Sequence, residues 1–310
     1  MARIVLTRTL PFPAIERLAA EHELETWPDR FPPSPERLRE LLADAEGLLC
    51  MLTDSVDSET IEAAGRLKAI ATLAVGTDNI DLDAASAHGI PVGNTPDVLT
   101  DATADLTFAL LLASARRLKA AADDVLDGEW ETWEPARWLG SDVSGATLGI
   151  VGLGRIGRAV ARRSEGFGMT VLHTSRSAEG AVSLDELLER SDFVSLHCPL
   201  NPETRHLINQ STLARMRPTA HLVNTSRGPI VDQSALAQAL REGEIAGAAL
   251  DVTDPEPLAP GDPLLEAPNL LVVPHIGSAT HRARERMADI AVDNLLAALD
   301  GRPMPHRANG

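Results

Sequence analysis

Short apolar runs alternate along the chain with longer segments that mix apolar and polar residues. The short runs are rich in Val, Ile and Leu and predict buried strands, while the segments between them have the length of helices. In the first hundred residues the predicted strands cover Arg3–Thr7, Leu24–Trp27, Gly47–Leu52, Ala69–Leu73 and Pro91–Gly93, and the predicted helices cover Pro13–Ala20, Pro35–Ala43 and Ser58–Ala63. Such alternation is typical of an α/β fold with parallel sheets.

A second series of the same kind begins at Thr147. Its later predicted strands are Val171–His173, Phe193–Leu196, His221–Asn224, Gly247–Asp251 and Leu270–Val273, and a final helix is predicted from Thr280 to Leu299. At about 150 residues per domain, a chain of 310 residues holds two domains. We therefore expect two Rossmann-like or flavodoxin-like domains, each a doubly wound parallel sheet, with an active-site cleft between them. If the final helix packs on the first domain, that domain is discontinuous.

Between the two series, one long helix is predicted from Asp101 to Leu126. The segment Gly128–Gly140 follows it and carries three of the four tryptophans, Trp130, Trp133 and Trp138. It has neither a heptad nor a charge pattern. Two interpretations remain open, a packed or dimer-contacting arm and a loop that is anchored by its aromatic side chains.

The charge balance excludes some classes of partner. The formal net charge is −17, from 28 basic and 45 acidic side chains. Nucleic acids and anionic membranes are bound by basic surfaces, so we expect neither as a partner. Only Lys68 and Lys119 are lysines. A GC-rich codon bias explains this preference for arginine more simply than a high-salt cytoplasm does, although both would produce it.

The cysteines and the apolar stretches indicate the compartment. Two cysteines, Cys50 and Cys198, make no disulfide framework and are typical of a reduced cytoplasmic chain. The first residues lack a charged leader followed by an apolar core, so we expect no signal peptide. The longest apolar stretch, Leu106–Ala115, is about half of a membrane span and predicts a buried helix.

The sharpest local motif is a G-x-G-x-x-G sequence formed by Gly152, Gly154 and Gly157. It follows an apolar strand and opens a helix. In this setting the first glycine makes the tight turn, the second lets the backbone approach a pyrophosphate, and the third lets the helix pack on the strand. Dinucleotide binding is the favoured interpretation, over a methyltransferase-type nucleoside loop or a plain glycine-rich turn.

The next strand, Met169–His173, lacks the acidic residue that holds the ribose hydroxyls in NAD enzymes. It is followed by Thr174-Ser175-Arg176-Ser177, and the first carboxylate after it is Glu179. Small hydroxyls and a guanidinium suit a 2′-phosphate, because arginine offers forked donors and a permanent charge. The sequence therefore favours NADP(H) over NAD(H). In the alternative, Arg176 points into solvent and either cofactor is accepted.

Three later strand ends each carry a polar residue, namely Arg227, Glu256 and His275. Ligands of open α/β sheets bind beyond the carboxyl ends of the strands, so these side chains are placed to meet. Histidine is the usual proton donor for a carbonyl that accepts hydride, and a neighbouring carboxylate orients its ring. Arginine binds a carboxylate and polarises a carbonyl. Together the three predict hydride transfer to a 2-oxo acid.

With these motifs, the chain resembles the family of D-isomer-specific 2-hydroxyacid dehydrogenases over nearly its whole length. The segments that carry the resemblance are Gly149–Gly157, Asn224–Gly228, Leu250–Pro257, Pro274–Thr280, Ala74–Asp81 and Leu196–Leu200. Within the family, Leu48–Asp54, Asp101–Asp105 and Gly166–Met169 are most similar to glyoxylate/hydroxypyruvate reductases. One departure is Thr253, where many members carry an aromatic residue, which puts the local packing in doubt.

The resemblance implies roles for individual residues. His275 would be the acid/base, Glu256 its partner and Arg227 the third catalytic residue, while the backbone N–H groups of Val75 and Gly76 would hold the substrate carboxylate together with Arg227 and His275. The implied cofactor contacts are Thr103, Gly152, Leu153, Gly154, Arg155, Ile156, Gly157, Ser175, Arg176, Ser177, Cys198, Pro199, Thr225, Ser226, Arg227, Asp251, His275 and Gly277.

The resemblance also implies the organisation of the molecule. A substrate-binding lid domain would comprise residues 1–98 and 285–310, and an NAD(P)-binding Rossmann domain would comprise residues 99–284. Two such chains would form a homodimer.

His197 stands beside Cys198, but no second His/Cys pair lies at ligand spacing, so we expect no metal site.

Three functions are therefore compared. The favoured one is an NADP(H)-dependent reductase of a small 2-oxo acid, glyoxylate or hydroxypyruvate. The second is another dehydrogenase on the same scaffold: Glu256 counts against formate oxidation, whereas the set of Arg227, Glu256 and His275 also suits another D-2-hydroxy acid or phosphite. The third is a non-catalytic NAD(P)-sensing binding protein.

Overall fold

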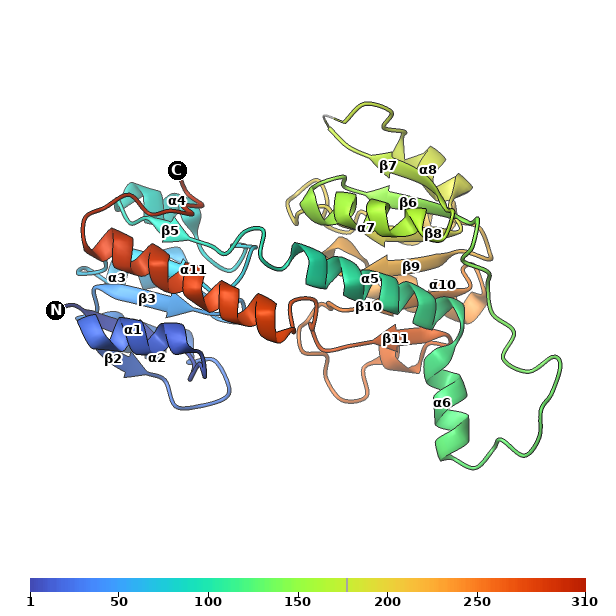
Figure 1. Ribbon diagram of the computed structural model, residues 1–310, viewed down its shortest axis with the longest axis horizontal. Coiled ribbons are helices and arrows are strands. Elements are labelled where there is room, and N and C mark those ends of the chain that lie inside the picture. The colour runs from blue at the N-terminus through green and yellow to red at the C-terminus, as the bar shows by residue number, and fades with distance from the viewer. Residues whose placement is uncertain (177) are drawn as a thin grey trace. The chain divides into compact units, whose positions relative to one another are not determined.

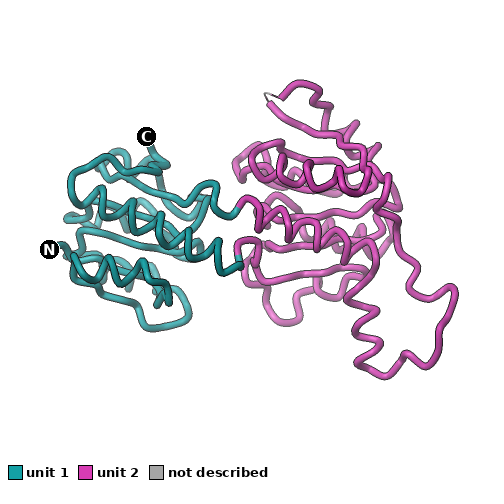
Figure 2. The backbone as a smooth tube through the Cα atoms, in the orientation of Figure 1, with its two compact units in different colours: residues 1–99, 279–310 teal, residues 100–278 magenta. Residues whose placement is uncertain are grey.

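The computed structural model describes residues 1–176 and 178–310, which form two compact units (Figure 2). Unit 1 comprises Met1–Leu99 and Ala279–Gly310, and unit 2 comprises Thr100–Ser278. The chain therefore returns from unit 2 to unit 1 before the final helix begins, whereas the boundary expected from the sequence, at 284/285, lies inside that helix. The physical reason is a cap: the Thr280 side chain accepts a hydrogen bond from the Ala283 N–H, 3.2 Å away, so the helix begins at His281 and belongs whole to unit 1.

Unit 1 is built on a five-stranded parallel sheet in the order β2-β1-β3-β4-β5. This is the flavodoxin-like strand order. Figure 1 labels β2, β3 and β5 of this sheet. The strands are β1 (Arg3–Leu6), β2 (Glu23–Thr26), β3 (Gly47–Cys50), β4 (Ala69–Thr72) and β5 (Val92–Gly93). The order reverses between β1 and β3, so the loops that follow these two strands lie side by side.

Helices cover both faces of this sheet. They are α1 (Pro13–Glu21), α2 (Pro35–Leu42), α3 (Ser58–Ala63), α4 (Leu82–Ala87) and α11 (His281–Leu299). Neighbouring strand residues point to opposite faces: Leu48 packs in the cluster with α2 and α3, and Leu49 packs in the cluster with α1 and α11. This explains why the strands are apolar at consecutive positions, as expected of a parallel sheet that is buried on both sides.

Unit 2 is built on a six-stranded parallel sheet in the order β11-β10-β9-β8-β6-β7. The strands are β6 (Thr147–Val151), β7 (Thr170–Thr174), β8 (Phe193–Leu196), β9 (His221–Asn224), β10 (Gly247–Leu250) and β11 (Leu270–Val272). The order changes direction at β6, which lies between β7 and β8. That switch point is where open α/β sheets place their ligands.

The faces of the second sheet are covered by separate sets of helices. The elements are α5 (Thr100–Ala115), α6 (Leu118–Leu126), α7 (Arg155–Glu165), α8 (Leu184–Arg190), α9 (Gln210–Leu213), α10 (Gln233–Glu242) and the 3₁₀ turns η1 (Gly228–Ile230) and η2 (Pro263–Glu266). Leu222 packs in the cluster with α8 and α10, whereas Val223 packs in the cluster with α5 and α7. Helices therefore bury both faces of the sheet, so a ligand site is expected at the ends of the strands.

The single helix expected from Asp101 to Leu126 is wrong, because the chain breaks between α5 and α6. Arg117 has a left-handed backbone with φ 52°. The chain that returns from the tryptophan-rich segment supplies the reason: the Ser141 N–H donates to the Ala115 carbonyl at 2.9 Å, and the Arg117 guanidinium lies 5.4 Å from the Trp138 ring centre. These contacts replace the next helical turn.

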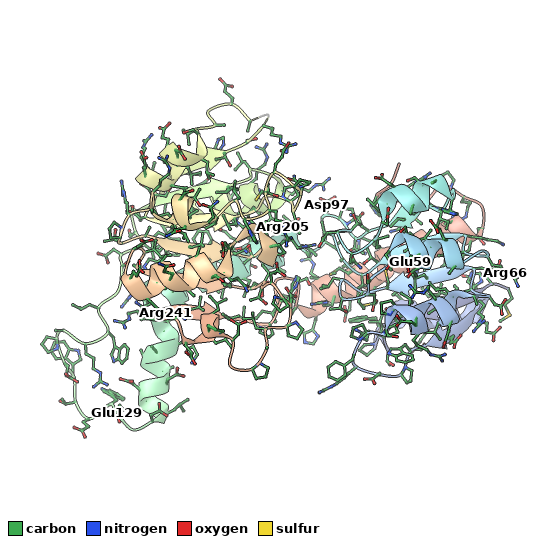
Figure 3. All side chains as sticks on the ribbon, turned by 180° about the vertical axis from the view of Figure 1, so that it is seen from behind. Glu59, Arg66, Asp97, Glu129, Arg205 and Arg241 are labelled. Atoms are coloured by element: carbon green, nitrogen blue, oxygen red, sulfur yellow. The ribbon has the colours of Figure 1, made fainter. Side chains whose placement is uncertain are left out.

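The structure agrees with one of the two interpretations of the tryptophan-rich segment, a loop anchored by an aromatic side chain, whereas contact with a second copy stays a prediction. Trp138 anchors the segment at the start of α6, whereas Trp130 and Trp133 are exposed. Figure 3 labels Glu129 on this stretch, beyond the end of α6. Leu126 and Leu139 add exposed apolar surface to the same part of unit 2. Within the part of the chain that the structure describes, no helix is long and apolar enough to cross a membrane.

Candidate active site

The carboxyl ends of the unit 2 strands carry nearly all the residues that the sequence singles out in this unit. Because the sheet is parallel, these ends share one edge. Going along the chain, the edge receives Gly152 after β6, Ser175 and Arg176 after β7, Cys198 and Pro199 after β8, Thr225 to Arg227 after β9, Asp251 and Glu256 after β10, and His275 after β11.

The glycine loop after β6 is shaped by close contacts at two of its three glycines. Gly152 has φ 95°, and a Cβ there would lie 2.7 Å from the Cys198 nitrogen. A Cβ at Gly157 would lie 2.3 Å from the Gly152 carbonyl oxygen. Only glycine lets the turn close against the β8 loop and lets α7 pack on the strand.

The middle glycine differs, because a Cβ at Gly154 would meet no atom within 4 Å. Gly154 is also the N-cap of α7 and provides no capping side chain. The first N–H groups of α7, from Arg155 and Ile156 onward, lie at the positive end of the helix dipole. This cradle fits the pyrophosphate of a dinucleotide, with Leu153 in the same turn.

At the end of β7, the Gly152 N–H donates to the Thr174 hydroxyl at 3.3 Å, which ties β7 to the glycine loop. The Ser175 hydroxyl accepts from the Ala178 N–H at 3.0 Å. Arg176 is exposed and forms an ion pair with Glu203 from the loop after β8. Sequence reasoning missed Glu203, because no local pattern links residues so far apart. Ser177, expected to contact the cofactor, lies outside the described residues.

The turn after β9 is held by the fully buried Asn224. Its Oδ1 accepts from the Ser226 N–H at 3.0 Å, and its Nδ2 donates to the Arg227 carbonyl at 2.9 Å. The Ser226 hydroxyl donates to the Cys198 carbonyl, and the Thr225 hydroxyl bonds that of Thr107 at 2.9 Å. The Arg227 backbone is thus fixed by its neighbours, and Asn224 is a further positioning residue that the sequence did not single out.

The loops that carry Arg227 and Glu256 approach each other at a glycine. A Cβ at Gly228 would lie 1.9 Å from the Thr253 carbonyl oxygen, so no larger residue fits there. Thr253, the departure from the family pattern, is buried. Its hydroxyl donates to the Pro255 carbonyl at 2.9 Å, and its N–H lies 3.4 Å from the Glu256 Oε2. A threonine therefore packs this loop and bonds within it.

Glu256 and His275 are paired, as the sequence suggested. The Oε1 of Glu256 is hydrogen-bonded to Nδ1 of His275, and the two side chains are 31% and 24% exposed. A proton on Nδ1 faces the carboxylate, so Nε2 is the ring atom that remains for exchange with a ligand. The pair is open enough to be reached and fixed enough to be oriented.

The buried Asp251 builds the turn on which His275 stands. Its two carboxylate oxygens accept from the N–H groups of Ile276 and Gly277 at 2.6 and 2.9 Å, and its carbonyl accepts from the His275 N–H at 2.9 Å. His275 itself has φ 50°, a strained conformation for a side chain of this size. Burial raises the pKa of the Asp251 carboxyl. The Thr103 hydroxyl joins the turn by donating to the Gly277 carbonyl at 3.2 Å.

In unit 1, Val75 and Gly76 lie in the loop after β4. The Asn94 side chain donates to the Val75 carbonyl at 2.7 Å. Asn294 of α11, fully buried, donates to the Asn94 carbonyl at 3.0 Å and accepts from the His306 N–H at 2.9 Å. The loop is therefore braced from β5, from α11 and from the C-terminal tail.

The loop after β3 in unit 1 is folded around Asp54. This carboxylate accepts from the Thr7 hydroxyl and from the Met51 N–H, the latter at 2.6 Å, and Arg8 lies 3.6 Å away. Burial raises the pKa of the Asp54 carboxyl. Asn79 closes the loop with bonds to the carbonyls of Met51 and Asp54 at 3.0 and 2.8 Å. The strand ends of unit 1 thus carry ordered loops as well.

The cysteine beside the glycine loop offers no reactive thiolate. Burial raises the pKa of the Cys198 thiol to about 11, so it stays protonated at neutral pH. The neighbouring His197 bonds the Ser195 hydroxyl at 2.8 Å. Across residues 1–176 and 178–310, no three His, Cys, Asp or Glu side chains are grouped as metal ligands would be.

Comparison with known proteins agrees with this geometry. Residues 108–277 match the family model described as D-isomer specific 2-hydroxyacid dehydrogenase, NAD binding domain. A glyoxylate reductase of Korarchaeum cryptofilum is 48% identical over 317 residues, covering 99% of this chain and 96% of that protein. A crystal structure of a Thermus thermophilus protein has a TM-score of 0.94 at 49% identity, with 99% of both chains covered.

A second similar structure was solved with ligands. It is an NADPH-dependent glyoxylate/hydroxypyruvate reductase of Sinorhizobium meliloti in complex with NADP and malonate. Its TM-score is 0.88 at 33% identity, with 99% of this chain and 97% of that chain covered.

Proposed function

The chain belongs to the family of D-isomer specific 2-hydroxyacid dehydrogenases, and we propose that it reduces glyoxylate or hydroxypyruvate with NADPH. The observation that carries the proposal is the hydrogen-bonded pair of Glu256 and His275, on the same sheet edge as the glycine cradle and Arg227. Relatives that bear the names glyoxylate reductase and glyoxylate/hydroxypyruvate reductase support the choice of substrate.

In the proposed reaction a bound nicotinamide supplies the hydride that reduces the carbonyl carbon. The Nε2–H of His275 donates a proton to the carbonyl oxygen, so a 2-oxo acid becomes a 2-hydroxy acid. Glu256 orients the imidazole through Nδ1 and stabilises its positive charge before that proton leaves. Arg227 binds the substrate carboxylate and polarises the carbonyl, which favours charge development on oxygen.

For the cofactor we assign a preference for NADP(H). No acidic residue follows β7 directly in the sequence, where an NAD enzyme carries the carboxylate that holds the ribose hydroxyls, and Arg176 stands there instead. The similar Sinorhizobium meliloti enzyme is NADPH-dependent. The ratio of kcat/KM for NADPH and NADH tests the assignment, and a ratio at or below one would contradict it.

The partner we assign is a second copy of the chain. The side chains of Leu126, Trp130, Trp133 and Leu139 are exposed on α6 and on the segment that follows it. Large apolar groups exposed in this way are typical of an interface between proteins. Light scattering of the purified protein would give twice the monomer mass, and the double variant Trp130→Ser/Trp133→Ser would lower it.

The test of the reaction is an NADPH-oxidation assay over glyoxylate, hydroxypyruvate, pyruvate and phenylpyruvate. We expect the highest kcat/KM with one of the first two acids. Turnover of pyruvate or phenylpyruvate alone would assign another D-2-hydroxy acid, and reduction of NADP⁺ by phosphite alone would assign the phosphite reaction. Tight binding of NADPH without turnover of any compound would instead support a nucleotide-sensing protein.

A further inference from the structure

The loop after β8 holds one carboxylate at a fixed place beside the end of β7. In this loop the Asn201 side chain accepts from the N–H groups of Glu203 and Thr204 at 2.9 and 3.0 Å. The Thr204 hydroxyl donates to the Pro199 carbonyl at 2.6 Å. The backbone of Glu203 is therefore tied to the end of the strand, and only its side chain remains free to move.

That side chain reaches the one guanidinium in the segment Thr174–Arg176. The Oε2 of Glu203 pairs with Nη2 of Arg176, and the side chains are 76% and 79% exposed. Ion pairs as exposed as this are weak and are screened by salt. A doubly charged phosphate that bonds the guanidinium at two atoms is a stronger partner, so it would displace the carboxylate.

We propose that Glu203 is a specificity-determining residue that competes with the 2′-phosphate of NADP(H) for Arg176. The inference rests on the proposed preference for NADP(H). With NAD(H), the carboxylate keeps the guanidinium as its partner, so no unpaired cation faces the ribose hydroxyls. With NADP(H), the guanidinium turns to the phosphate, and the nearby carboxylate repels that phosphate. Glu203 thus keeps the enzyme able to use both cofactors and limits its selectivity.

The variant Glu203→Gln keeps the size and the polar end of the side chain while removing its charge. The probes are 2′,5′-ADP and 5′-ADP, which differ by the 2′-phosphate and bind without turnover. We expect Glu203→Gln to lower the Kd for 2′,5′-ADP about fivefold, and to change the Kd for 5′-ADP by less. Isothermal titration calorimetry at low ionic strength measures both constants, and added salt should shrink the difference.

A matched control is Glu165→Gln at the far end of α7, which changes the net charge equally and should leave both constants unchanged. The outcomes separate the two claims. If the wild-type chain prefers 2′,5′-ADP and Glu203→Gln does not strengthen that preference, or weakens it, the role of Glu203 is overturned and the NADP(H) assignment stands. If neither chain distinguishes the two probes, the assignment of Arg176 to the phosphate is overturned together with that of Glu203.

Discussion

Glu256 and His275 are joined by a hydrogen bond between Oε1 and Nδ1, although they stand on separate loops after β10 and β11. Other bonds hold these loops as well: Thr253 bonds within the first, and Asp251, at the start of the first loop, binds two N–H groups of the second. The bond therefore joins two prearranged loops, which is how an imidazole keeps one orientation while a ligand comes and goes.

Replacing the acid/base tests its role. His275→Gln removes the imidazole that donates the proton, and we expect kcat for glyoxylate reduction to fall by about 10²–10⁴-fold. The cofactor contacts assigned to the glycine loop are untouched, so the Kd for NADPH should change little. Steady-state kinetics and fluorescence titration measure the two constants. A kcat near that of the wild-type chain would rule out this role for His275.

Two glycines of the loop should respond differently to the same change. Gly154→Ala places a methyl group in open space, so it should leave the stability of the free protein nearly unchanged and weaken NADPH binding. Gly157→Ala places a methyl group against the Gly152 carbonyl and should lower the free energy of unfolding by about 1–3 kcal/mol. Urea denaturation and a Kd for NADPH distinguish the two variants. Equal effects on stability would contradict the assignment of the cradle to Gly154.

Acid should destabilise unit 2 through His221. Burial lowers the pKa of this histidine to about 4, and its ring bonds the hydroxyls of Ser114 and Ser141 at 2.8 and 3.1 Å. In the unfolded chain an imidazole titrates near pH 6.5, so between pH 6.5 and 4 the unfolded state binds more protons. The stability that His221 contributes is therefore complete above pH 6.5 and is lost as the pH falls toward 4.

The full loss is about 3 kcal/mol, of which about 2 kcal/mol falls between pH 7.5 and pH 5. That part is measured as the difference in free energy of unfolding between pH 7.5 and pH 5, by urea denaturation. His221→Gln keeps polar atoms near the serines and cannot gain this proton. We therefore expect the variant to lose less stability over the same pH range than the wild-type chain. An equal loss in both would show that other groups govern the acid response.

The strand ends could be predicted from the sequence because their signals are local. The glycine motif follows an apolar strand directly, and Arg227 and His275 come within a few residues of theirs. What the sequence could not give depends on contacts between distant segments. The break at Arg117 is set by Ser141 and Trp138, and the partner of Arg176 is supplied by the β8 loop. No periodicity in the helix or in β7 carries that information.

The roles of two buried amide side chains could not be predicted from the sequence either. Asn224 and Asn294 look like ordinary polar residues in a strand and a helix, yet each is fully buried with both ends of its amide bonded. Their importance follows from the cost of burying a polar group without partners. Only the packing around them reveals which loops they hold.

The most direct test of the central claim is the stoichiometry of the proposed reaction, the amount of glycolate formed for each NADPH consumed. Purified protein is incubated with NADPH and glyoxylate, and NADPH consumption is followed together with the formation of glycolate. We predict that one molecule of glycolate forms for each NADPH consumed, and that His275→Gln nearly abolishes both processes. Bound NADPH that is not consumed in the presence of glyoxylate or hydroxypyruvate would contradict the proposed function.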